Sequence, residues 1–207
     1  MTPFLDHPAL SLLSELLDVP SPSGREERLG ERVSAKVADL GYVPVTDGAG
    51  NVLVRLPGRD SDAPLTVVAA HLDEIAMVVV AIEEDGALRV DRSGGLHPWK
   101  LGECPVDIVG DGEPVRGVLS YGSTHTKVAE SGGGQWSDWR VITGLSRGQL
   151  AAAGVRVGST AVPFRAMRGP VVFGDPADPL VAAWTFDDRG GVVTLLRLLG
   201  AVREQGI

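Results

Sequence analysis

The sequence contains a single cysteine, Cys104, among its 207 residues. One cysteine excludes an internal disulfide framework and any zinc site built from several cysteines. Basic residues are also in the minority, because 19 Lys and Arg stand against 27 Asp and Glu, for a formal net charge of −8. The phosphates of nucleic acids attract basic surfaces, so we expect no nucleic-acid partner for this acidic chain.

Long apolar runs are missing as well. The longest, residues 75–82, is far shorter than the roughly 20 residues that a helix needs to cross a bilayer. The N-terminal segment has no basic lead and carries Asp6, His7 and Glu15, which is not the pattern of a secretory signal. We therefore expect a soluble, cytoplasmic protein with no membrane partner.

The N-terminal part shows helix and strand patterns in turn. "PALSLLSELLD" predicts a first helix, and Ser23 with Glu26 forms a capping-box pattern before a second one. "YVPVT" and "NVLVRL" flank the turn "DGAG", which predicts a hairpin, and "LTVVAA" is apolar throughout, as in a strand buried on both faces. Four apolar residues share one face of the second helix: Leu29, Val33, Val37 and Leu40. This alternation indicates an α/β layer architecture.

The character of the chain changes twice. Residues 1–75 have the α/β pattern, whereas residues 76–170 contain short β-like runs separated by glycine-rich turns, with "CPVDIV" and "VRGVLS" as paired strands and "SRGQLAAAG" as a helix. Residues 171–207 return to the first pattern, with a strand at 181–186 that leads into a helix. We predict an α/β domain made of residues 1–75 and 171–207, interrupted by a small β-rich insert at 76–170.

Two polar clusters end the two predicted buried strands. The first contains His71 and Asp73, and strand periodicity points their side chains the same way. A histidine can bind a divalent cation through one nitrogen while a carboxylate holds the proton of the other. The second is Asp187-Asp188-Arg189, where a carboxylate can bridge two metal ions. Each cluster also has a purely structural interpretation, as a polar strand end or as a helix cap beside a paired arginine.

Four stretches carry a resemblance to a known family. In order along the chain they are "AAHLDEIAMVVVAI", "GGLHPWKLGECPVDIVGDGEPVRGVLS", "GLSRGQLAAAGVRVGSTAVP" and "WTFDDRGG". Together they resemble the cobalt- or zinc-dependent deblocking and glutamyl aminopeptidases, the tetrahedral-shell (TET-type) metallopeptidases of family M forty-two. The resemblance implies a three-layer, two-metal peptidase domain interrupted by a β-rich dimerisation domain, PDZ-like or barrel-like.

The same resemblance implies residue roles and partners. His71 would be a metal ligand, Asp73 the catalytic-site acid that orients it, and Asp187 the carboxylate that bridges both metals. Asp188 and Arg189 would support these ligands or the fold. The cofactors would be two divalent ions, zinc, cobalt or manganese, and the reaction the removal of N-terminal residues from a peptide substrate by metal-activated water. The protein would form a homo-oligomer through the insert.

The chain departs from the family pattern at its C-terminal end. The family's Glu-Glu pair, a further acidic ligand and a late histidine ligand all follow the D-D-R helix, whereas this sequence ends at Ile207. We therefore expect a truncated, N-terminal portion that binds metal weakly or in part and is inactive alone, unless a second chain completes the peptidase domain. Two alternatives stay open: a non-catalytic remnant or assembly partner, and a related metal-dependent deacylase or carboxypeptidase.

Overall fold

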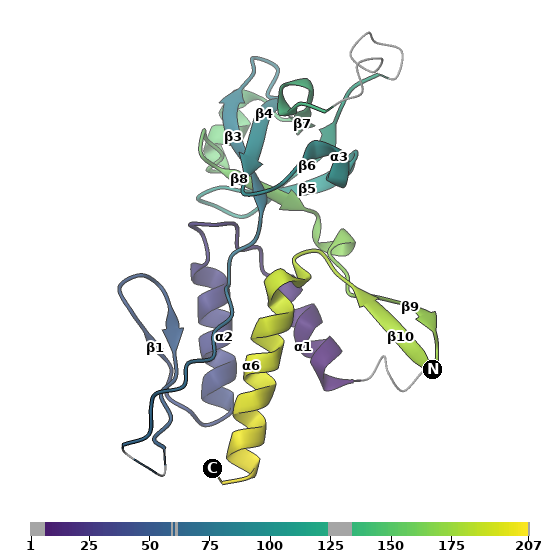
Figure 1. Cartoon of the computed structure of the whole chain (residues 1–207). Helices are drawn as coiled ribbons and strands as arrows, with labels where there is room; N and C mark the ends of the chain where they lie inside the picture. The colour runs from purple at the N-terminus through teal and green to yellow at the C-terminus, as the bar shows by residue number, and fades with distance from the viewer. Residues whose placement is uncertain (1–6, 59, 61, 124–133, 207) are drawn as a thin grey trace. The chain divides into compact units, whose positions relative to one another are not determined.

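The computed structural model describes residues 7–58, 60, 62–123 and 134–206. The chain forms two compact units: the first comprises residues 1–74 and 170–207, and the second comprises residues 75–169. Figure 1 shows helices and hairpins in the first unit and a small barrel in the second. Over the described ranges, no helix is long and apolar enough to cross a membrane.

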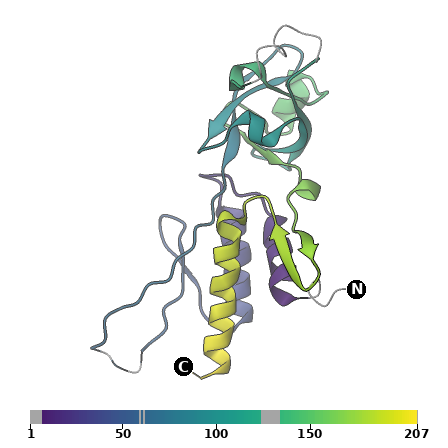
Figure 2. The ribbon, with the colours of Figure 1, turned by 45° about the vertical axis from the view of Figure 1, so that its right-hand side comes forward.

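Three helices form the core of the first unit. They are α1 (Pro8–Leu17), α2 (Glu27–Asp39) and α6 (Phe186–Glu204), and α6 runs beside α2 in both views (Figures 1 and 2). The predicted apolar face of α2 is confirmed, because it packs into one cluster with α1 and α6. The buried members of this cluster are Leu13, Leu16, Leu17, Leu29, Val33, Val37, Val192, Val193 and Leu196.

The capping box predicted at Ser23 is wrong. Helix α2 begins at Glu27, and its N-cap residue Glu26 makes no side-chain capping hydrogen bond. The Ser23 hydroxyl instead donates a 2.6 Å hydrogen bond to Oδ2 of Asp73, while Oε1 of Glu26 accepts one from the backbone N–H of Gly24. A hydrogen bond to an ionised carboxylate is stronger than one between neutral groups, which accounts for the choice of partner.

Two hairpins complete the regular structure of the first unit. Strands β1 (Val45–Thr46) and β2 (Val52–Leu53) pair antiparallel, which confirms the hairpin predicted around "DGAG". Asp47 closes this turn, and its hydrogen bonds from the side chain and backbone of Asn51 and the backbone of Ala49 hold its pKa below the ordinary value. Strands β9 (Val171–Asp175) and β10 (Asp178–Ala182) form the second hairpin.

Both predicted buried strands next to the polar clusters are wrong in the described part of the chain. Residues 65–70 belong to no β-ladder there, and Leu65 and Val67 are 76% and 74% exposed. The later strand ends at Ala182, before the helix α6 begins at Phe186. An apolar run becomes a buried strand only where neighbouring strands take up its N–H and C=O groups, and the described residues place none beside residues 65–70.

The second unit is built around a closed barrel. Its strands are β3 (Ala76–Ile82), β4 (Leu88–Ser93), β5 (Cys104–Val109), β6 (Val115–Ser120), β7 (Arg140–Ile142) and β8 (Thr160–Pro163), in the order β3-β4-β7-β6-β5-β8. The predicted pairing of "CPVDIV" with "VRGVLS" is confirmed as the antiparallel β5–β6 pair. Of the two forms expected for this part of the chain, the described residues adopt the barrel.

Short helices join the barrel strands. They are α3 (Pro98–Leu101), η1 (Trp136–Asp138), α5 (Arg147–Ala152) and η2 (Arg165–Met167). The helix predicted in "SRGQLAAAG" is confirmed as α5, which begins with a complete capping box between Ser146 and Gln149. Apolar side chains that alternate with polar ones fill the interior of the barrel, as in β4, where Leu88 and Val90 are buried and Arg89 is exposed.

Candidate metal site

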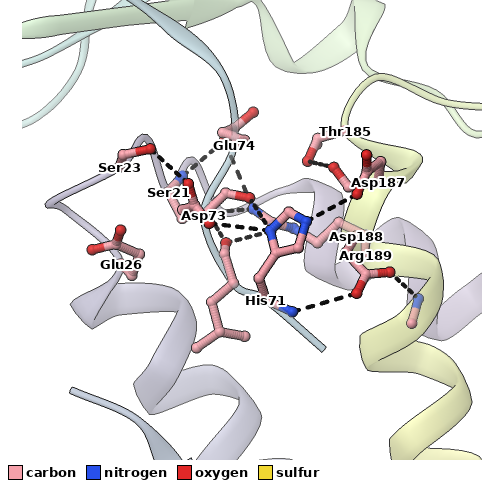
Figure 3. A network of polar contacts seen from close by, with 12 residues as sticks. Ser21, Ser23, Glu26, His71, Asp73, Glu74, Thr185, Asp187, Asp188 and Arg189 are labelled. Carbon is pink, nitrogen blue, oxygen red and sulfur yellow. Dashed lines mark hydrogen bonds and ion pairs between the residues drawn. The ribbon is translucent and has the colours of Figure 1, made fainter. Parts of the chain in front are cut away.

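Three segments of the first unit meet around His71. Residues 71–74 are an extended segment just before β3, residues 187–189 open helix α6, and residues 21–23 follow helix α1. Figure 3 shows the side chains of His71, Asp73 and Asp187 pointing toward one another. The structure therefore brings together all three residues that the sequence singled out, although Asp187 lies 116 residues from His71.

Both nitrogens of the His71 ring face oxygen atoms. Nδ1 lies 3.1 Å from Oδ1 of Asp73 and 3.1 Å from the backbone oxygen of the same residue. Nε2 lies 2.9 Å from Oδ1 of Asp187. A neutral imidazole carries only one N–H, so it satisfies only one of these two sides. The other side needs a positive charge between nitrogen and oxygen, which either a second proton or a metal ion supplies.

The charge of His71 follows the same arrangement. Partial burial acts to lower its pKa, but the hydrogen bond to Asp187 and the backbone and carboxylate of Asp73 outweigh burial. The pKa of His71 is therefore raised above its ordinary value. The oxygen atoms around this ring thus favour its protonated, positively charged form.

The carboxylates on the two sides of His71 differ in their surroundings. Asp73 is held from behind by Ser23, whose hydroxyl donates to Oδ2 and leaves Oδ1 for the ring. The Asp187 side chain is 94% exposed, so its carboxylate has room for further ligands. Asp73 is thus held in place on one side of the ring, whereas Asp187 is open to solvent on the other.

Asp188 acts as the cap of helix α6. Its Oδ1 accepts a 2.9 Å hydrogen bond from the backbone N–H of Gly191, and its Oδ2 accepts one of 3.3 Å from the backbone N–H of His71. The backbone angles at Asp187 and Asp188 are not helical, so regular helix begins after Asp188. The structural interpretation of the D-D-R cluster is thus correct for Asp188, which also touches the His71 segment.

A buried ion pair lies beneath the site. The side chains of Glu74 and Arg189 are both fully buried, with Oε1 of Glu74 3.7 Å from Nη2 of Arg189. Oε2 of Glu74 accepts a hydrogen bond from the indole N–H of Trp184 at 3.0 Å. The sequence alone indicates no role for Glu74. It shows an acid beside an apolar run and an arginine after two acids, but no pattern in it identifies Glu74 and Arg189 as partners.

The residues present fit part of a metal site. Zinc lies about 2.0–2.2 Å from histidine nitrogen or carboxylate oxygen, so two ligands of one tetrahedral ion are roughly 3.4 Å apart. The 2.9 Å between Nε2 of His71 and Oδ1 of Asp187 is a hydrogen-bond distance, and the two atoms need to separate by only roughly half an ångström to share one ion. In the described part of the chain, however, no group of three or more His, Cys, Asp or Glu side chains is placed to hold a metal ion. The described site therefore offers fewer ligands than a complete one.

Comparison with known proteins assigns the chain to a family. Residues 50–207 match the family model described as M42 glutamyl aminopeptidase, which is most of the chain. This chain belongs to that family.

Individual relatives agree with the assignment. A lysyl aminopeptidase of Pyrococcus furiosus is 30% identical over 154 residues, which are 72% of this chain and 43% of that protein. The solved structure of an aminopeptidase from the archaeon Desulfurococcus kamchatkensis has a TM-score of 0.79 at 28% identity, and covers 93% of this chain and 51% of its own. The TET1 peptidase of Pyrococcus horikoshii, described as assembling into a tetrahedron or a large octahedral shell, has a TM-score of 0.75 at 23% identity, and the match covers 93% of this chain and 56% of its own.

These matches share one limit in length. The chain spans about half the length, or less, of the curated relatives that it matches. The fold of the relatives, an α/β architecture with a barrel, extends to this chain.

Proposed function

We propose that this protein is a metal-dependent aminopeptidase, which removes residues from the N-terminus of peptides. Family membership supports the reaction class, because the family model and the relatives from Pyrococcus furiosus and Desulfurococcus kamchatkensis are aminopeptidases. One observation carries the proposal to residues: both ring nitrogens of His71 face oxygen acceptors, so one side of the ring needs either a second proton or a metal ion. A divalent metal ion held by His71 and Asp187 would meet that need.

Several residues around His71 would contribute to holding such an ion. Asp73 accepts a hydrogen bond from Nδ1–H of His71, so that Nε2 presents its lone pair toward Asp187. Ser23 fixes the carboxylate of Asp73, and Asp188 holds the backbone N–H of His71. When bound, divalent ions supply Lewis-acid polarisation of a peptide carbonyl and activation of water. The protein groups orient the ligands and set their protonation for that chemistry.

The expected affinity follows from the number of ligands. Catalytic zinc sites normally have at least three protein ligands, whereas His71 and Asp187 are two. We expect the residues described here to bind zinc, cobalt or manganese weakly, and a full two-metal site to need ligands from additional polypeptide. Peptide hydrolysis should require that complete set, so low activity is expected of these residues alone.

Self-association belongs to the same proposal. The TET1 peptidase of Pyrococcus horikoshii is described as a shell of many copies, and the barrel of this chain occupies the place of the insert. We expect homo-oligomers formed through the barrel unit, and a cytoplasmic location. Size-exclusion chromatography with light scattering tests the first expectation, since a monomer at every concentration would contradict it.

Metal titration tests the site. Isothermal titration of the chain with zinc, cobalt and manganese should show saturable binding, which His71→Gln and Asp187→Asn each abolish. His97→Gln is the matched control, because His97 lies in the second unit, stacked on Trp99. An unchanged affinity in His71→Gln or Asp187→Asn would refute the assignment. Hydrolysis of Leu- or Glu-p-nitroanilide, measured with and without each metal, then tests the reaction class.

A further inference from the structure

The Arg189 side chain connects the two clusters that hold the candidate ligands. From the start of α6, its Nη1 donates a 2.6 Å hydrogen bond to the backbone oxygen of Leu72. Its Nη2 donates to Oγ of Ser21 at 2.5 Å and to the backbone oxygen of Val19 at 3.3 Å. Leu72 lies between His71 and Asp73, and Arg189 lies two positions after Asp187. The Arg189 side chain therefore links the segment that carries Asp187 to the backbone of the segment that carries His71.

Glu74 makes the reverse connection. It follows Asp73 directly, and its Oε2 accepts the indole N–H of Trp184, three residues before Asp187. Its Oε1 accepts the backbone N–H of Ser21 at 2.8 Å, and its own N–H donates to the backbone oxygen of Ser21 at 3.0 Å. The two charged side chains thus cross between the same two segments in opposite directions and share Ser21.

Ser21 completes the network from the third segment. Its hydroxyl donates a 2.7 Å hydrogen bond to the backbone oxygen of Leu72, the same atom that accepts from Arg189. This carbonyl is therefore held from two directions. Ser21 is fully buried, as are the side chains of Glu74 and Arg189, so water does not compete for these bonds.

We propose that Glu74 and Arg189 are positioning residues that set the distance between Nε2 of His71 and the carboxylate of Asp187. This inference rests on the proposed function, because it gives the network a role in metal binding beyond stability. The guanidinium is suited to the role, since its planar fork bonds three acceptors at fixed angles, which a lysine ammonium does not reproduce. Groups behind metal ligands typically change metal affinity by about 10- to 100-fold when they are altered.

Two variants test the role while retaining most of the buried volume. Glu74→Gln keeps an oxygen for Ser21 but removes the charge beside Arg189, and Ser21→Ala removes only the hydroxyl that shares the Leu72 carbonyl. Zinc affinity should fall at least about tenfold in Glu74→Gln and less in Ser21→Ala. Circular dichroism at 222 nm identifies the folded variants, and affinity is compared among those. Asp107→Asn is the matched control, because it breaks the Asp107–Arg116 pair of the barrel unit.

A readout without metal separates this inference from the proposed function. Nitrogen-15 NMR of the metal-free chain reports the protonation of each His71 ring nitrogen, with the signals assigned through His71→Gln. Glu74→Gln should move these signals, and Asp107→Asn should not. If the unaltered chain binds no metal but the signals move, the proposed function fails and the positioning role stands. If folded Glu74→Gln keeps both the zinc affinity and the His71 signals of the unaltered chain, the positioning role is refuted.

Discussion

Replacement of Asp188 by alanine gives a quantitative test of how the D-D-R cluster is built. The substitution removes the acceptor of the Gly191 N–H, an N-cap contact whose loss typically costs about 1 kcal/mol. It also removes the acceptor of the His71 N–H, which at 3.3 Å and in a solvated position adds roughly 0.5 kcal/mol. We expect Asp188→Ala to lower the free energy of unfolding by about 1–2 kcal/mol.

Urea unfolding followed at 222 nm measures this change. The signal at this wavelength comes mainly from α1, α2 and α6, which all belong to the first unit. Asp188→Asn is the matched control, because asparagine is as good an N-cap acceptor as aspartate and keeps an oxygen toward Gly191. The asparagine variant should lose less than half as much as the alanine variant. Equal stability of Asp188→Ala and the unaltered chain would refute the capping role.

Gly191 offers a second approach to the same cap. A Cβ added there would lie 2.2 Å from Oδ1 of Asp188, so an alanine displaces the capping carboxylate. Alanine in a helix is normally about 1 kcal/mol better than glycine. Gly191→Ala should therefore not raise the free energy of unfolding in the urea experiment. A gain of the full 1 kcal/mol or so would show that the Asp188 carboxylate is not needed as a cap in its present position.

Two further predictions concern the barrel unit. In Gly86→Ala, the added Cβ would lie 1.8 Å from the backbone oxygen of Leu145 at a φ of +84°, so we expect a loss of about 3 kcal/mol or more in thermal unfolding. Gly144→Ala, at a φ of +69° with open space around the Cβ, should lose only about 1–2 kcal/mol; equal losses would contradict the steric argument. Burial raises the pKa of the Cys104 thiol, so its alkylation by iodoacetamide at pH 8 should be slow in the folded chain and fast in guanidinium. Equal rates in both solvents would show that the thiol is accessible.

Several local patterns in the sequence were informative. The apolar face of α2, the hairpin around Asp47 and the β5–β6 pair all depend on residues close together in the chain, and all are confirmed. The shared orientation of His71 and Asp73 also follows from a two-residue spacing, and the structure places the carboxylate of Asp73 beside Nδ1 of His71. Periodicity and turn chemistry suffice for such features.

Contacts between distant segments were not accessible in this way. Ser23 has the spacing of a helix cap, but its hydroxyl meets a carboxylate 50 residues away. Glu74 and Arg189 are each recognisable as charged residues near apolar sequence, yet their pairing depends on how three segments fold together. The run at residues 65–70 has the composition of a buried strand, but burial depends on neighbouring strands that the pattern itself does not specify.

The antiparallel pairing of β3 with β8 has a consequence for the entropy of assembling the site. His71 and Asp187 are 116 residues apart, and closing so long a loop carries a large entropic penalty. The barrel places Met77 opposite Ala161, so in a chain whose barrel has formed, only roughly 30 residues of connecting chain separate the two ends of the site. This shortening lowers the loop-closure penalty by about 1 kcal/mol, on the (3/2)RT ln n scale. A formed barrel thus favours the His71–Asp187 contact through chain connectivity alone.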